Sequence, residues 1–221
     1  MADINFNNLT KKQLQLFLTG YCRHRHKYCE HPNCFLTEQG LNPKLGFLDI
    51  ETSNLKANFG VMYSYAIKDG ESKTIYGRTI TKEEIESETM DKQLVQDCID
   101  DIYRFDKILT YYGTRFDVPF IRSRALYWGI AFPEYATVNH KDVYYMARSK
   151  LCIHSNRLEV ATRFLGIKGK THIENEYWIR AMQGDEKSLE YIWVHNKKDV
   201  EILQRLYERL KNFTKDTNRS I

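Results

Sequence analysis

The segment GFLDIETSNL, from Gly46 to Leu55, decides how the rest of the chain is interpreted. Its first residues are mainly apolar and predict a buried β-strand. Asp49 and Glu51 stand two residues apart in this strand, so both side chains point to one face. Burying two carboxylates together costs free energy unless a positive charge lies between them, and a divalent cation can supply that charge. The pair therefore indicates a metal site; the alternative is an acidic pair at the exposed end of a surface strand.

The segments that follow predict a mixed sheet. Asp69-Gly70 is typical of a hairpin turn, so the β-rich runs on either side of it predict antiparallel strands. The expected elements are strands at 61–68, 73–80 and 107–112, and helices at 81–105, 117–127 and 187–211. Three consecutive strands, then a strand and helices, predict an α/β domain in which helices flank a mixed sheet.

A further acidic position lies at the start of the predicted central helix. Asp117 falls in the sequence YGTRFDVPF, from Tyr112 to Phe120. Pro119 is compatible with a first helical turn, so the helix is expected to begin near Asp117. An aspartate there can cap the helix or add a carboxylate to the strand pair, and the residues alone leave both interpretations open.

The last predicted helix carries one more acidic residue on its apolar face. Apolar residues recur every three or four positions between Leu189 and Leu210, and Asp199 falls within this stripe. His195 lies one turn earlier on the same side and can reach whatever Asp199 binds. With an ordinary pKa of about 6.5, histidine is a competent base near neutral pH. The alternative is a core aspartate held by a salt bridge.

The order of these motifs resembles the DEDD superfamily of 3′-5′ exonucleases, which have a ribonuclease H-like fold and include the proofreading exonucleases. More narrowly, four segments look like the predicted ribonuclease H-like exonucleases of bacteria and phages. These segments are Gly46–Leu55, Tyr112–Phe120, His154–Ala161 and His195–Leu203, and the resemblance spans residues 20–210 approximately. It implies an α/β, ribonuclease H-like fold.

The resemblance also implies a site and a reaction. Asp49, Glu51, Asp117 and Asp199 would hold two Mg²⁺ or Mn²⁺ ions about 3.5–4 Å apart, which clamp the attacking and leaving oxygens of a phosphodiester. His195 would position or deprotonate the attacking water. The implied activity is the removal of nucleotides, one at a time, from a nucleic-acid 3′ end.

Two positions depart from the superfamily pattern. Its members carry either tyrosine four residues before the last aspartate or histidine five residues before it. Here His195 stands four residues before Asp199, and Val194 occupies the other place. Relatives often carry asparagine where this chain has Tyr112, which concerns sugar or base recognition rather than metal binding.

The segment YCRHRHKYCEHPNCF, from Tyr21 to Phe35, is rich in metal-ligand residue types. The spacing His-x2-Cys occurs twice in it and is typical of zinc sites. We predict a structural zinc site formed by Cys22, His26, His31 and Cys34. The residues alone do not separate His24 from His26, and Cys29 is set aside only because similar leaders in the exonuclease relatives suggest that it is dispensable. The alternative is a basic, solvated loop with reduced thiols.

The composition limits the class of protein. The chain has 221 residues, 42% of them apolar and 28% charged, with a mean hydropathy of -0.57, which argues against fibrous, disordered and membrane-spanning proteins. The N-terminus lacks the basic and apolar pattern of a signal peptide, so a cytoplasmic location is expected. The expected domains are an N-terminal helix and zinc-binding arm at 1–44, the exonuclease domain at 45–212 and a polar tail at 213–221.

Basic residues are concentrated in one part of the chain. Residues 139–172 carry seven Lys or Arg but only two acidic residues, Asp142 and Glu159, and Asp142 is expected to cap a helix. Such an excess suits a polyanionic partner, and aromatic residues near Asp117 could stack on unpaired bases. The candidate phosphate contacts are Lys141, Arg148, Lys150, Arg157, Arg163, Lys168 and Lys170, and the candidate stacking residues are Tyr111, Tyr112 and Phe116.

These observations predict a nucleic-acid partner, and the sequence is compatible with more than one function. We expect a nucleic-acid partner, with single-stranded DNA 3′ ends favoured over RNA. The alternatives are an exoribonuclease that trims RNA 3′ ends, a catalytically silent nucleic-acid-binding module and a structural protein whose acidic residues form ion pairs. Nothing in the residues separates DNA from RNA, because a contact to the 2′-hydroxyl cannot be assigned from sequence.

Overall fold

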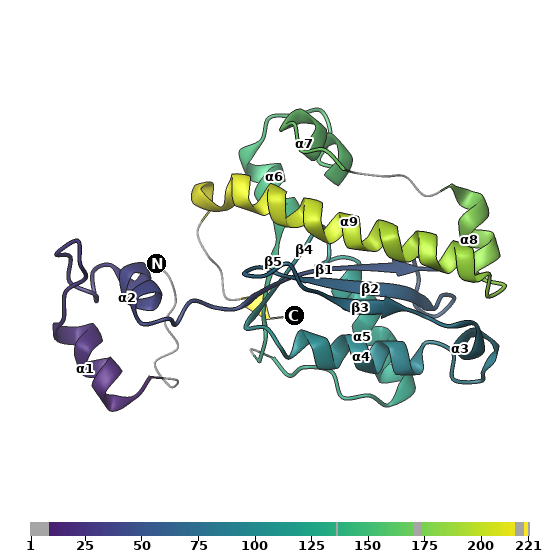
Figure 1. Ribbon diagram of the computed structural model, residues 1–221, viewed down its shortest axis with the longest axis horizontal. Coiled ribbons are helices and arrows are strands. Elements are labelled where there is room, and N and C mark those ends of the chain that lie inside the picture. Colours follow the sequence, from purple (N-terminus) through teal and green to yellow (C-terminus); the bar gives the residue numbers. More distant parts are fainter. Residues whose placement is uncertain (1–8, 136, 170–173, 215–218, 221) are drawn as a thin grey trace. The chain divides into compact units, whose positions relative to one another are not determined.

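A computed structural model describes residues 9–135, 137–169, 174–214 and 219–220 (Figure 1). The described residues form two compact units. The N-terminal unit runs to Pro43, and the sheet unit comprises Lys44–Thr214 together with Arg219 and Ser220. Each unit is considered by itself below.

Six strands of the described residues form one mixed sheet in the sheet unit, in the order β3-β2-β1-β4-β5-β6. The strands β1, β2 and β3 are antiparallel neighbours, β1, β4 and β5 run parallel, and β6 is antiparallel to β5. Their bounds are β1 Leu45–Thr52, β2 Met62–Asp69, β3 Ile75–Thr79, β4 Lys107–Thr110, β5 Asn139–Asp142 and β6 Arg219–Ser220. The predicted mixed sheet of the ribonuclease H type is confirmed.

Helices cover both faces of this sheet (Figure 1). On one face lie α9 (Glu186–Leu210), α6 (Val143–Lys150) and α7 (Leu158–Phe164), and on the other lie α4 (Lys92–Ile102) and α5 (Asp117–Trp128). Each layer has its own apolar core. The core beneath α9 includes Phe47, Ala66, Leu109, Val143, Ala161 and Leu203, and the opposite core includes Leu48, Ile67, Leu94, Ile99, Ile108 and Ile121.

Strand β1 sends alternate side chains to the two faces, because successive residues of a strand point in opposite directions. Phe47 packs in the core beneath α9, whereas Leu48 and Ile50 pack in the opposite core. Asp49 and Glu51 therefore share the α9 face with Phe47. Both residues pair with β2, whereas the pairing of β1 with β4 ends at Phe47, so the carboxylates lie where β1 extends beyond β4.

The helix predicted from 81 to 105 is two helices. It starts as expected, because Thr81 and Glu84 form a capping box at α3 (Lys82–Glu86). The chain then turns, and α4 begins only after the fully buried Asp91. The Asp91 carboxylate accepts hydrogen bonds from the Arg124 guanidinium and the Met62 backbone N–H. These partners are distant in sequence, so the apolar spacing gave no sign of the break.

The other long elements match their predicted positions. Helix α9 spans Glu186–Leu210, and α5 begins at Asp117. The remaining helices of the sheet unit are α8 (Asn175–Ala181) and the 3-10 turn η2 (Lys211–Phe213). In the region expected to be a polar tail, Arg219 and Ser220 pair with β5. None of the described helices is long and apolar enough to cross a membrane.

The N-terminal unit is small. It contains α1 (Lys11–Thr19), a turn closed by the antiparallel bridge between Tyr21 and Lys27, and α2 (Pro32–Glu38). A capping box starts α1, and α2 begins within the segment predicted to bind zinc. Among its described residues, Phe17, Cys22, Tyr28 and Phe35 form a buried apolar cluster, and Leu36 is buried as well.

Candidate active site

The Asp49 carboxylate is held by a buried asparagine of α9. Asn196 Nδ2 donates a hydrogen bond to Asp49 Oδ2 at 2.7 Å. The other end of the Asn196 amide accepts a hydrogen bond from Ser64 Oγ at 3.0 Å. Asn196 and Ser64 are both fully buried. A chain of hydrogen bonds from β2 through α9 to β1 therefore fixes the orientation of Asp49.

Glu51, His195 and Asp199 form one group with the potential to hold a metal ion. His195 Nε2 lies 3.5 Å from Glu51 Oε1 and 3.4 Å from Asp199 Oδ2. One candidate ligand atom from each residue lies within 4.8 Å of the others. The three side chains are at most 16% exposed, so water screens their charges poorly. Two carboxylates that lie this close together and away from water repel each other, and a cation bound between them would remove that repulsion.

Asp117 reaches the same segment of β1 from the other helix layer. Its Oδ1 accepts a hydrogen bond at 3.2 Å from the backbone N–H of Ile50, the residue between Asp49 and Glu51. Burial raises the pKa of Asp117 to about 7, although hydrogen bonds from the backbone N–H groups of Asp117 and Ile50 lower it. The ionised form of such a carboxyl group is stabilised by a nearby cation.

Asp142 organises the loop that leads into α5. Its carboxylate accepts hydrogen bonds from the backbone N–H groups of Tyr112 at 2.8 Å and Thr114 at 3.0 Å. It also accepts one from Tyr144 N, so its predicted role as a helix cap is confirmed at α6. Tyr112 has a φ of +68°, an unfavourable value for a side chain of this size, and the contact with Asp142 helps to offset that cost. Asp142 thus places the loop from which Asp117 enters the site.

The five predicted catalytic residues are arranged around one part of β1. Glu51, His195 and Asp199 form the group described above. Asp49 is joined to α9 through Asn196, next to His195, and Asp117 is joined to β1 through Ile50. Their assignment as ion ligands and base stays a prediction.

Sequence reasoning missed Asn196 and Ser64. Asn196 stands three residues before Asp199 and belongs to the same buried stripe of α9. A polar residue in an apolar stripe was the signal that singled out Asp199, and it applied equally to Asn196. Ser64 had no such signal, because a serine in a strand carries little information about its partner.

In the N-terminal unit, the structure groups part of the predicted zinc ligands. Cys22, His24 and Cys34 place candidate ligand atoms within 4.8 Å of one another. His26 and His31 are not in this group; their rings stack with centroids 4.1 Å apart. The predicted set of Cys22, His26, His31 and Cys34 stays a prediction.

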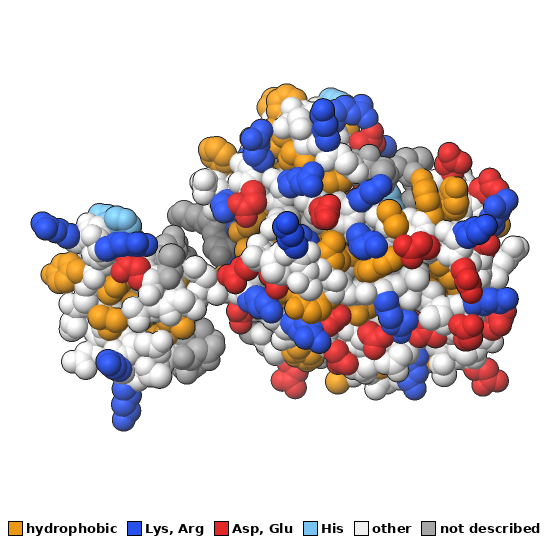
Figure 2. All heavy atoms as spheres, viewed as in Figure 1, with side chains coloured by type: hydrophobic (Ala, Val, Ile, Leu, Met, Phe, Trp, Pro, Cys, Tyr) orange, Lys and Arg blue, Asp and Glu red, His pale blue; other side chains and the backbone are white. Residues whose placement is uncertain are grey.

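Five of the seven basic residues predicted to contact phosphates are exposed. Lys141 is buried, and its Nζ lies 5.9 Å from the ring centroid of Tyr207. The prediction that Lys141 lies on the surface is therefore wrong. Lys170 lies outside the described residues. The exposed members are Arg148, Lys150, Arg157, Arg163 and Lys168. On the face of the sheet unit seen in Figure 2, Lys and Arg side chains gather around α6 and α7.

Of the three predicted stacking residues, Tyr112 is the one that is most open to solvent. It is 46% exposed, and its ring packs edge-to-face on Tyr144 with centroids 4.8 Å apart. The Tyr111 hydroxyl instead donates a hydrogen bond to the backbone carbonyl of Asn156, and Phe116 packs against Phe120. Tyr112 is therefore the aromatic side chain best placed to meet a ligand beside this loop.

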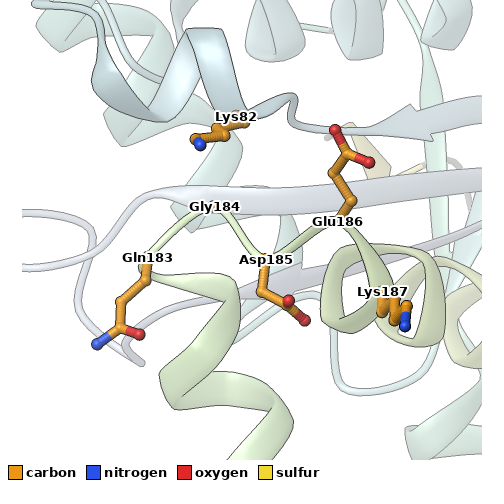
Figure 3. Close-up of a pocket in the computed structure, with 6 residues that line it drawn as sticks. All are labelled: Lys82, Gln183, Gly184, Asp185, Glu186 and Lys187. Atoms are coloured by element: carbon orange, nitrogen blue, oxygen red, sulfur yellow. The ribbon is translucent and has the colours of Figure 1, made fainter.

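A cavity of about 530 Å³ lies elsewhere in the sheet unit, at the turn between α8 and α9 (Figure 3). Lys82 lies beside Gly184 there, and the Asp185 carboxylate caps α9 through Ser188. The residues that line the cavity are Lys82, Gln183, Gly184, Asp185, Glu186 and Lys187. None of the acidic site residues is among them, so this cavity is not part of the candidate active site.

A family model for the RNase H superfamily matches residues 46–211. The chain belongs to the RNase H superfamily. The matched residues contain all five predicted catalytic positions, and the membership agrees with the coarse resemblance to DEDD exonucleases. The narrower likeness to bacterial and phage exonucleases stays a prediction.

Comparison with solved structures supports the same fold. The chain is similar to the family B DNA polymerase from the hyperthermophilic archaeon Pyrobaculum calidifontis, with a TM-score of 0.63 and 17% sequence identity. The match covers 77% of this chain and 25% of the polymerase chain, so this RNase H superfamily protein corresponds to about a quarter of that enzyme. No curated protein sequence matches the chain.

Proposed function

We propose that the sheet unit is a metal-dependent 3′-5′ exonuclease that hydrolyses phosphodiester bonds at nucleic-acid ends. The observation that carries the proposal is the group formed by Glu51, His195 and Asp199, in a domain of the RNase H superfamily. Superfamily membership supports a nuclease that acts on nucleic acid. The buried acidic group supplies the chemistry that such a reaction needs.

The acidic residues suit divalent cations with oxygen ligands. Asp49, Glu51, Asp117 and Asp199 would hold two Mg²⁺ or Mn²⁺ ions, because these hard cations prefer carboxylate oxygens. When bound, two such ions supply positive charge to the attacking and leaving oxygens of the phosphodiester. The hydrogen bonds from Asn196 and Ile50 hold two of these carboxylates in place before any ion arrives.

His195 takes the role of proton acceptor in this proposal. It lies between Glu51 and Asp199, where an imidazole can accept a proton from water and pass it to solvent.

The proposed substrate is single-stranded DNA. Tyr112 offers a partly exposed ring beside the loop that leads to Asp117, and aromatic rings stack on unpaired bases of any sequence. The exposed Lys and Arg side chains around α6 and α7 would attract the phosphate backbone. RNA also offers unpaired bases for stacking and a phosphate backbone, so the experiment must include it.

The test uses DNA and RNA oligonucleotides of matched sequence, labelled at either end, with Mg²⁺ or Mn²⁺. We expect stepwise loss of nucleotides from the 3′ end of DNA, and a fall in rate of at least about 100-fold in Asp49→Asn and Asp199→Asn. Asp100→Asn is the matched control, since Asp100 is exposed on α4. Thermal unfolding of each variant shows whether a loss of rate reflects a loss of fold.

Each alternative gives a distinct result. Shortening of RNA alone would overturn the preference for DNA. Oligonucleotide binding without nucleotide release at any metal concentration would show a silent binding module and overturn the proposal. Nuclease activity that survives in both Asp49→Asn and Asp199→Asn would place the catalytic site elsewhere.

A further inference from the structure

The N-terminal unit has little apolar material to hold it folded. Among its described residues, the buried apolar cluster has only four members, and one of them is Cys22. Units of fewer than about 40 residues usually need a metal, disulfides or a partner chain to fold stably. The N-terminal unit, which runs from Met1 to Pro43, is close to that size. A cross-link among its side chains would supply what the core lacks.

Three side chains of this unit have the geometry of metal ligands. Cys22, His24 and Cys34 place candidate ligand atoms within 4.8 Å of one another. Cys22 Sγ lies 4.0 Å from His24 Nδ1. In a tetrahedral zinc site with bonds of about 2.0–2.3 Å, neighbouring ligand atoms lie about 3.3–3.8 Å apart. The observed distance needs only a small adjustment to reach that range.

The backbone presents these ligands from two elements. Cys22 and His24 lie in a tight turn, in which Arg25 adopts a φ of +64° and its N–H donates to the carbonyl of Cys22 at 2.8 Å. Cys34 is the third residue of α2, and its N–H donates to the carbonyl of His31 at 3.0 Å. His31 and Cys34 therefore lie one turn apart at the start of the helix, a spacing that places two side chains on the same side.

We propose that Cys22, His24, His31 and Cys34 bind one structural Zn²⁺ ion that holds the N-terminal unit folded. Two ligands come from the turn and two from the start of α2, and two thiolates with two imidazoles are a common ligand set for structural zinc. His31 is exposed and binds after a rotation of its ring away from His26. His26 packs against His31 and is not a ligand, and Cys29 is exposed and outside the group.

This inference goes beyond the proposed nuclease activity, because a closed four-ligand site leaves no position for substrate. The zinc content is therefore independent of the acidic residues of the sheet unit. Asp49→Asn should lose nuclease activity and keep its zinc. The two proposals can consequently fail separately.

The test begins with the metal content of the full chain, purified without added metal or chelator and then reconstituted with Zn²⁺ or Co²⁺. We expect one Zn²⁺ per chain that resists dialysis, and X-ray absorption that shows two sulfur and two nitrogen ligands. Co²⁺ should give the charge-transfer absorption of thiolate ligands. Cys22→Ser, His24→Ala, His31→Ala and Cys34→Ser should each lower zinc affinity at least tenfold.

Matched controls use residues of the same types outside the set. Cys29→Ser, Cys152→Ser and His26→Ala should retain the full zinc content. Loss of zinc in His26→Ala together with retention in His24→Ala would overturn the ligand assignment. A wild-type chain that binds no zinc and no cobalt, or that forms a Cys22–Cys34 disulfide in place of metal binding, would overturn the site itself. The spectra of the wild-type chain decide this even if some variants fail to fold.

Discussion

Asn196 shows how one neutral side chain can control a charged one. Its amide donates to the partly buried Asp49 at one end and accepts from Ser64 at the other, and both Asn196 and Ser64 are fully buried. A buried hydrogen bond that loses one partner leaves the other polar group unsatisfied, which costs about 1–3 kcal/mol. The orientation of Asp49 therefore depends on the exact chemistry of this amide.

The substitution Asn196→Asp tests that dependence with little change in size. It replaces the donor to Asp49 with a second carboxylate, so the two groups repel each other. We expect the free energy of unfolding to fall by about 1–3 kcal/mol and the nuclease rate to fall about 10–100-fold. Chemical denaturation and oligonucleotide digestion measure the two effects. Asn175→Asp, at an exposed position of α8, is the control, and an equal loss in that variant would contradict the role of Asn196.

His195 can be tested by comparing two aromatic replacements. Tyrosine occupies the position four residues before the last aspartate in many members of the resembled superfamily, so His195→Tyr should retain most of the activity. His195→Phe keeps a ring but has no polar atom, and its kcat should fall about 10²–10⁴-fold with little change in KM. Steady-state kinetics on a 3′-labelled oligonucleotide separates these outcomes. If the phenylalanine variant were as active as the wild type, His195 would have no part in proton transfer.

Several residues of the candidate site could be predicted from the sequence, because the signal lies in their immediate neighbours in the chain. Asp49, Glu51 and Asp199 are charged residues in otherwise apolar patterns, and such a conflict is visible without a structure. Ser64 could not be found in this way, because its importance comes from a partner that is distant in sequence. The exclusion of Lys141 from the surface likewise depends on packing against Tyr207.

At the level of elements, Asp142 links three parts of the sheet unit. It ends β5, caps α6 and holds the loop between β4 and α5 through the N–H groups of Tyr112 and Thr114. This loop determines where α5 starts and hence where Asp117 enters the site. A change at Asp142 should therefore affect catalysis through the position of the loop.

We expect Asp142→Ala to lower the free energy of unfolding by about 1–3 kcal/mol, because three backbone N–H groups lose their acceptor. The nuclease rate should fall as well, with a larger fall at low Mg²⁺ concentration, since Asp117 is no longer held in place. Thermal unfolding and a Mg²⁺ titration of the rate measure both effects. Asp100→Ala, on the exposed side of α4, should change neither quantity. A stable Asp142→Ala variant with wild-type Mg²⁺ dependence would contradict this account.

Helices and strands were predicted well where the spacing of apolar residues defines them. They were predicted poorly where a contact with a residue distant in sequence determines where a helix ends. Helix α9 and strand β1 have long, regular patterns, and both lie where the sequence indicates. The break between α3 and α4 depends on Asp91, whose carboxylate is bound by Arg124 of α5. Apolar spacing reports which face of a helix is buried, but it does not report such a contact.

At the scale of the whole molecule, the two units use different means of stabilisation. The sheet unit has an extended apolar core on each side of its sheet, whereas the described part of the N-terminal unit has one small apolar cluster and the proposed zinc site. All three tryptophans, Trp128, Trp178 and Trp193, belong to the sheet unit. Tryptophan fluorescence therefore reports on the sheet unit alone.

This distribution allows the effect of zinc removal to be located. A strong chelator should increase hydrogen exchange of backbone amides in residues 20–36, because metal binding and folding are coupled in small zinc-binding units. The unfolding midpoint followed by tryptophan fluorescence in a denaturant titration should stay the same, since the core of the sheet unit does not depend on that ion. Cys22→Ser should reproduce the exchange pattern without chelator, and Cys152→Ser should not. A fall of the fluorescence midpoint in both the chelated protein and Cys22→Ser would mean that the two units fold as one, with the ion stabilising the whole chain.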